Sequence, residues 1–145
     1  MIQKTYASDD EYIVDKMKQF KLIDMREQYP DIIREAEASH LSYLGFLRRL
    51  IEVEDEGKLV RKQEKLIDKA GFESIKDLED IDYSFNSSID RAKLYELGSL
   101  DFLEKKENIL IIGPPGVGKT MIATAIGRRA CNAGEKVLFA NAKEL

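Results

Sequence analysis

The sequence predicts an α-helical region over residues 1–75, followed over residues 76–145 by the first β-α-β portion of an α/β fold. Two observations carry this division. Before residue 75, apolar residues recur at helical spacing between charged ones. After residue 107, a glycine-rich loop separates a short apolar run at 108–112 from a helical stretch, and a second apolar run follows at 137–140. We therefore expect two domains.

Composition limits the classes of protein that fit. The chain has 145 residues, of which 43% are hydrophobic and 34% charged, so it can bury a core. Its net charge of -4 excludes a general attraction to nucleic acid and confines any such contact to a local patch. No apolar run has the length of a membrane span and no secretory leader is evident, so the cytoplasm is expected. Cys131 is interpreted as a packing residue and His40 as structural or exposed.

The first helix is predicted from a capping box at Ser8 and Glu11. It should run to about Gln28, because Pro30 interrupts helices. Residues 31–39 are predicted to form a short second helix.

A long helix is then predicted from Leu41 and Ser42 to Ala70, with Gly71 as its stop signal. Its apolar residues before position 55 cover a wide sector, which predicts deep packing. After Gly57 the apolar stripe narrows and points in roughly the opposite direction. Either the helix breaks near Gly57, or its two halves have different partners.

Five basic residues line the second half of this helix. Four lysines are spaced four, three and four residues apart, which places them on one side of a helix, and an arginine lies next to them. Such a row could follow the backbone of a nucleic acid, or it could be a solvated face with Glu64 and Asp68 as partners. The possible DNA contacts are Lys58, Arg61, Lys62, Lys65 and Lys69.

The second region opens on a segment at 81–85 that alternates apolar and polar residues. Ser87 or Ser88 is predicted to cap a leucine-rich helix that ends near Lys105 and Lys106, where cations suit the helix dipole.

The loop at 113–120 reads G-x-x-x-x-G-K-T, between the apolar run and a helix. Phosphate oxygens need several converging donors, and glycines let the backbone N–H groups approach them. Lys119 opens the helix, where its ammonium can reach a triphosphate, and the hydroxyl of Thr120 can bind Mg²⁺. Tyr83 and Phe85 could flank an adenine, or they could simply pack against the helix. Gly134 is expected to cap this helix in a left-handed conformation.

Residues 108–120 resemble the IstB-like helper ATPases of insertion sequences, which are relatives of the DnaC helicase loaders within the AAA+ class. The resemblance extends to the acidic segment at 78–85 and, more weakly, to the helical region, so it covers nearly the whole chain. Further positions that carry it are Ala123, Gly127, Ala130, Gly134, Val137, Phe139 and Leu145.

The resemblance implies an ATP-binding helper of DNA transposition that assists a transposase on double-stranded DNA and self-associates through its ATPase core. ATP and Mg²⁺ are the implied cofactors, with Thr120 on the metal. The implied nucleotide-binding residues are Gly113, Pro114, Pro115, Gly116, Val117, Gly118, Lys119, Thr120 and Met121.

Two features depart from the family's pattern. Met121 stands where the family usually has a histidine. The chain also shows no later apolar strand ending in the acidic residues that hold Mg²⁺ and polarise the attacking water. We therefore expect an incomplete P-loop (AAA+) core, weak or absent ATP hydrolysis, and no catalytic residue. A DnaC-like helicase loader and a truncated, non-hydrolysing module for DNA or protein binding stay open as alternatives.

Overall fold

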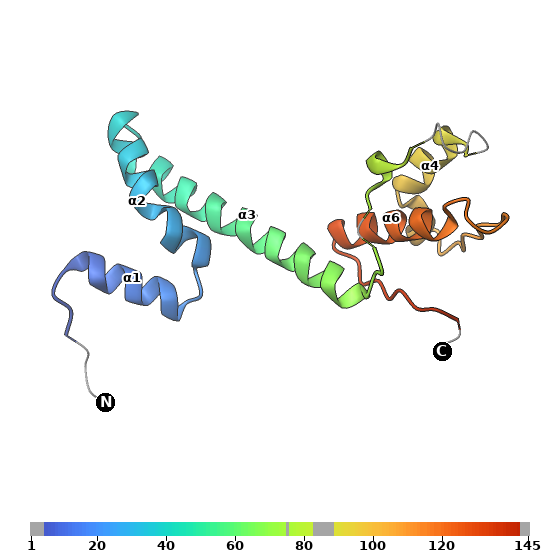
Figure 1. The fold of residues 1–145 in the computed structure, drawn as a ribbon. Helices are drawn as coiled ribbons and strands as arrows, with labels where there is room; N and C mark the ends of the chain where they lie inside the picture. The colour runs from blue at the N-terminus through green and yellow to red at the C-terminus, as the bar shows by residue number, and fades with distance from the viewer. Residues whose placement is uncertain (1–4, 75, 83–88, 143–145) are drawn as a thin grey trace. The chain divides into compact units, whose positions relative to one another are not determined.

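The computed structural model describes residues 5–74, 76–82 and 89–142 (Figure 1). Tyr83 and Phe85, as possible adenine contacts, and the predicted cap at Ser87 or Ser88 lie outside these residues. Within the described ranges the chain consists of helices and coil, without a strand. It divides into two compact units, Met1–Arg61 and Lys62–Leu145, each described by itself. The predicted domain boundary at residues 75 and 76 stays a prediction.

The first unit begins with α1 (Asp9–Gln19). Ser8 is its N-cap and accepts a hydrogen bond from the Glu11 N–H at 3.2 Å. The Glu11 carboxylate in turn accepts from the Ala7 N–H at 2.7 Å. The predicted helix start is confirmed, although Glu11 reaches back one residue further than in a standard capping box.

The predicted end of the first helix is wrong. α1 stops at Gln19, and α2 (Ile23–Ala38) runs through Pro30. The turn between them has Lys21 in the left-handed region, with φ 59°, and the Leu22 N–H donates to the Met17 carbonyl at 2.9 Å. This hydrogen bond ends a helix as a glycine cap would, but a lysine gives no compositional signal for it.

α3 (Tyr43–Ala70) is one continuous helix, so it does not break at Gly57. In the first unit its Leu50 and Val53 form a buried core with Ile32 of α2. Part of its predicted packed sector is nevertheless exposed, including Leu44 at 76%. Gly57 has a packing role instead: a Cβ there would overlap the carboxylate of Asp24. The glycine leaves room for the Asp24 side chain of α2 at this point.

The second unit contains the end of α3 and the elements η1 (Leu78–Asp80), α4 (Arg91–Gly98), α5 (Asp101–Glu104) and α6 (Lys119–Asn132). The single helix predicted up to Lys105 is divided at Leu100, which has φ 67°. Asp90 caps α4 by accepting from the Lys93 N–H at 3.2 Å. The buried core consists of Leu78, Ile81, Leu94, Ile122, Ala125 and Ile126.

The predicted strands are not confirmed. Residues 109–112 and 137–140 are coil. Their side chains are not buried on both faces: Leu110 is 82% exposed and Ile112 83%, whereas Ile111 packs against the core. A strand is defined by a paired backbone neighbour, and the Phe139 N–H instead donates to the Ala70 carbonyl at the end of α3, at 2.8 Å.

Candidate phosphate-binding site

The glycine-rich loop leads directly into α6. Gly116 and Gly118 have φ values of 82° and 91°, which side chains other than glycine rarely adopt, and Gly118 is the N-cap of α6. A Cβ on Gly113 would lie 3.2 Å from a methyl group of Val117, so the first glycine permits the tight loop. All three glycines therefore have the conformational role that the sequence predicts for them.

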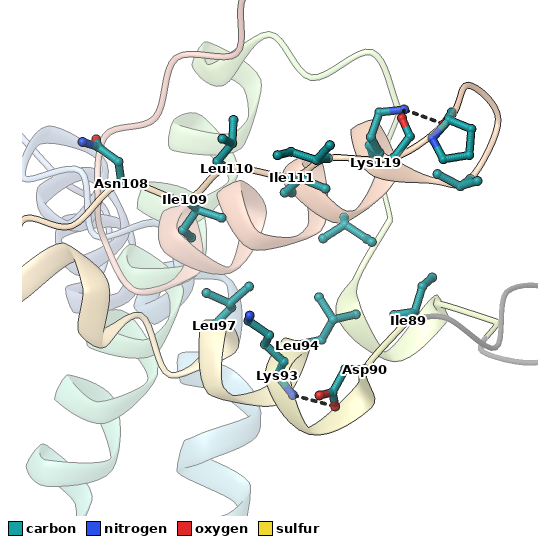
Figure 2. Close-up of a pocket in the computed structure, with 15 residues that line it drawn as sticks. Ile89, Asp90, Lys93, Leu94, Leu97, Asn108, Ile109, Leu110, Ile111 and Lys119 are labelled. Carbon is teal, nitrogen blue, oxygen red and sulfur yellow. Dashed lines mark hydrogen bonds between the residues drawn. The ribbon is translucent and has the colours of Figure 1, made fainter.

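Lys119, the first residue of α6, folds back over the loop. Its ammonium donates to the carbonyl oxygens of Gly113, at 2.8 Å, and Pro114, at 2.7 Å (Figure 2). Thr120 is exposed beside it, whereas Met121 packs against the hydrophobic core. The loop thus brings an ammonium, a hydroxyl and the N-terminus of a 14-residue helix together, a set of groups that suits an anion.

The buried face of α6 fixes the position of this site. Thr124 and Ala125 are 1% exposed, and Cys131 is fully buried. Burial raises the pKa of the Cys131 thiol, as expected for the packing residue that the sequence predicts. The helix ends as predicted at Gly134, which has φ 95°. Because the helix is anchored along its length, its first turn is held against the core.

Two cavities flank residues 109–111. One, of about 710 Å³, lies between α4 and the loop; Figure 2 shows Leu110 pointing away from Leu94 and Leu97 on its opposite wall. The other, of about 450 Å³, is lined by Ile109, Ile111, Glu73, Lys119, Thr120, Ala123, Phe139, Ala140, Asn141 and Ala142. Lys119 borders both cavities, so the space next to its side chain is open on either side of the chain.

The family model for the IstB-like ATP binding protein of insertion sequences of the IS21 type matches residues 15–145. The chain belongs to this family. It is 35% identical to a protein of Pseudomonas aeruginosa that is named for ATP binding in insertion sequence IS21, over 85% of this chain and 46% of the relative. It is 36% identical to one of Geobacillus stearothermophilus named likewise for insertion sequence IS5376, over 83% of this chain and 48% of the relative. This IstB-like chain spans about half the length of these relatives.

The IstB-like chain has no candidate metal cluster of three or more His, Cys, Asp or Glu side chains in the part that the structure describes. Thr120 thus stands as the predicted Mg²⁺ ligand with no such cluster next to it. None of the described helices is both long and apolar enough to cross a membrane.

The predicted basic row lies on α3, but its members have different surroundings. Lys58 is 3.7 Å from a carboxylate oxygen of Glu54, and Arg61 forms ion pairs with Asp24 and Glu54. The hydrogen bond with Asp24 is the main cause that raises the pKa of Arg61. Lys65 and Lys69 are exposed, and no described residue forms an ion pair with either.

The end of α3 is held by α6. The side-chain amide of Gln63 donates to the Asn132 carbonyl at 2.7 Å. Lys62 lies next to Gly134, where its cation faces the C-terminal end of α6.

Sequence reasoning missed Asp24, Glu54 and Gln63. The spacing of Glu54 to Lys58 and Arg61, four and seven residues, is a helical signal that could have indicated the first ion pairs. Asp24 and Asn132 belong to other elements, so no local pattern pointed to them.

Proposed function

We propose that this chain is an ATP-binding helper of DNA transposition, which binds Mg·ATP through residues 113–121 and assists a transposase on double-stranded DNA. The observation that carries the proposal is the loop itself: two positive-φ glycines, an ammonium folded over the loop and a helix N-terminus meet at one point. The family and the insertion-sequence names of its members support the rest.

The donors present fit a triphosphate and its cation. The backbone N–H groups of the loop and of the first turn of α6 are the donors for phosphate oxygens. When the nucleotide binds, the Lys119 ammonium leaves the carbonyl oxygens of Gly113 and Pro114 and contacts the β- and γ-phosphates. The exposed hydroxyl of Thr120 is the ligand for Mg²⁺. Met121 contributes its backbone alone, because its side chain packs on the core.

The same proposal assigns the loop to the α/β core of the AAA+ class, with residues 109–112 and 137–140 as its strands. One support is the order of the segments: an apolar run, the glycine-rich loop, α6 and a second apolar run. Another is that Ile109 and Ile111 are partly buried on one side of the chain. Self-association through this core and a cytoplasmic location belong to the proposal. The basic face of α3, with Lys58, Arg61, Lys62, Lys65 and Lys69, is its DNA contact.

Calorimetry with Mg·ATP tests the proposed site. Lys119→Ala should abolish or weaken binding by at least tenfold, because it removes the charge that meets the phosphates. Lys136→Ala, an exposed lysine beyond the other end of α6, is the matched control and should bind as the unchanged chain does. Absence of heat from a chain that is folded by circular dichroism would overturn the proposal.

Phosphate release on the same samples decides whether the chain is an ATPase. Turnover that Lys119→Ala stops supports the enzyme; binding without turnover supports the non-hydrolysing module. A helicase loader would capture a replicative helicase and not a transposase. The names of the relatives favour the transposase.

A further inference from the structure

Arg61 lies between two carboxylates of the first unit. One guanidinium nitrogen pairs with Asp24 of α2, and the other is 3.2 Å from Glu54 of α3. The Arg61 side chain is only 34% exposed. Both terminal nitrogens of the Arg61 guanidinium therefore contact carboxylates of the same unit.

Glu54 depends on these partners because it is buried. Its side chain is 4% exposed, and besides Arg61 it has Lys58 at 3.7 Å and the N–H of Met25 at 3.1 Å. Met25 is in the first turn of α2, whose N-cap residue makes no side-chain cap, so Glu54 caps that helix from α3. Losing Arg61 to a phosphate would leave the buried Glu54 carboxylate with poorer charge compensation, which opposes that exchange.

Gly57 fixes the geometry of this network. A Cβ at that position would overlap the Asp24 carboxylate, so only glycine lets Asp24 lie against α3 within reach of Arg61. The position of the Asp24 carboxylate therefore depends on the space beside Gly57 as well as on its charge.

The lysines farther along α3 differ. A rotation of about 100° per residue places Lys58, Lys62, Lys65 and Lys69 within an arc of about 60°. Lys65 and Lys69 are exposed, and in the described part of the chain no carboxylate pairs with them.

We propose that Asp24 and Glu54 are internal counter-ions that take the place of phosphates on Arg61 and Lys58, so that nucleic acid is bound by Lys62, Lys65 and Lys69 alone. The inference rests on the proposed DNA binding and narrows its surface. Asp24 and Glu54 thereby set the size of the cationic face, and neutralising them adds Arg61 and Lys58 of α3 to it.

The salt dependence of duplex DNA binding measures the number of cations that contact phosphates. Each phosphate contact adds about -0.9 to the slope of log K against the logarithm of the salt concentration. Fluorescence anisotropy of a labelled duplex between 50 and 200 mM NaCl, roughly the range in which such contacts are lost, gives the slope. The double variant Lys65→Gln with Lys69→Gln should flatten it by about 1.8. The double variant Asp24→Asn with Glu54→Gln should steepen it by about 1.8, because Arg61 and Lys58 both become free.

Two controls isolate Arg61. Adding Arg61→Gln to the Asp24 and Glu54 variant should reduce the steepening to about 0.9, the share of Lys58. Glu37→Gln with Glu56→Gln removes the same charge from exposed acids without an ion pair among the described residues, and should leave the slope unchanged. If the double acid variant does not fold, Asp24→Asn alone, which keeps Glu54, should shift the slope in the same direction.

The outcomes separate the two proposals. If the Lys65 and Lys69 variant flattens the slope and the acid variant leaves it unchanged, DNA binding stands and the counter-ion role is wrong. If the lysine variant has no effect, the proposed DNA face is itself wrong, and the inference is lost with it.

Discussion

At the scale of single residues, one glycine can decide how two helices meet. Gly57 is in the interior of α3, where glycine is unfavourable, yet the helix continues through it. Its lack of a side chain admits the Asp24 carboxylate, which then pairs with Arg61. A residue that sequence patterns mark as a possible break is therefore a contact.

Gly57→Ala tests this role. Alanine favours the helix by up to about 1 kcal/mol, but its Cβ would overlap the Asp24 carboxylate, which would have to move and lose its pairing with Arg61. We expect a net loss of about 1–3 kcal/mol in the free energy of unfolding, measured by urea denaturation. Gly45→Ala is the control in the same helix: its Cβ would meet the Ser42 hydroxyl at 3.3 Å and the Leu41 side chain at 3.9 Å, so that variant should be neutral or more stable. Equal stabilisation of both variants would refute a packing role for Gly57.

At the scale of elements, α2 stays helical through Pro30 because its packing outweighs the helix-breaking preference of proline. Pro30 removes one backbone donor from the helix interior, yet Ile32, two residues later, is buried against Leu50 and Val53. The burial of the following turn keeps the helix intact across the proline.

Pro30→Ala should therefore stabilise the chain. It restores the missing N–H at an exposed position and removes a helix-interior penalty of up to about 3 kcal/mol. A gain of about 1–2 kcal/mol in the urea-derived free energy of unfolding is expected. Gln28→Ala, also exposed in α2, should change it by less than about 0.5 kcal/mol. A loss of stability in Pro30→Ala would mean that proline itself is needed at this position.

The sequence predicted those features of each element that have a local signal, and it missed those that do not. Helix ends at Gly71 and Gly134 were predicted because glycine favours the left-handed conformation found there. The ends at Lys21 and Leu100 have the same conformation without glycine and gave no signal. In the candidate site, the loop glycines and Lys119 were predicted from spacing alone, whereas the partners of Arg61 come from a different helix.

At the scale of the whole molecule, the strand predictions are not confirmed, and they concern the feature on which the sequence holds least information. An apolar run indicates that a segment is suited to a sheet, but a strand forms only when another backbone segment pairs with it. Although residues 109–112 are coil, their side chains alternate as on a strand with one exposed face, with Ile111 inward and Leu110 outward. The pattern was therefore informative about the side chains and not about the pairing.

These outward side chains should make the chain self-associate. Leu110 is 82% exposed and Ile112 83%, next to backbone that no described strand covers, and such edges pair readily with other chains. The double variant Leu110→Lys with Ile112→Lys should lower the weight-average mass measured by sedimentation equilibrium, because charge on an edge opposes pairing. Leu59→Lys with Val60→Lys is the matched control: these apolar residues, 54% and 50% exposed, are in the middle of α3, where helical hydrogen bonds occupy the backbone. If both pairs lower the mass equally, general hydrophobicity drives the association; if neither does, the uncovered edge has no part in it.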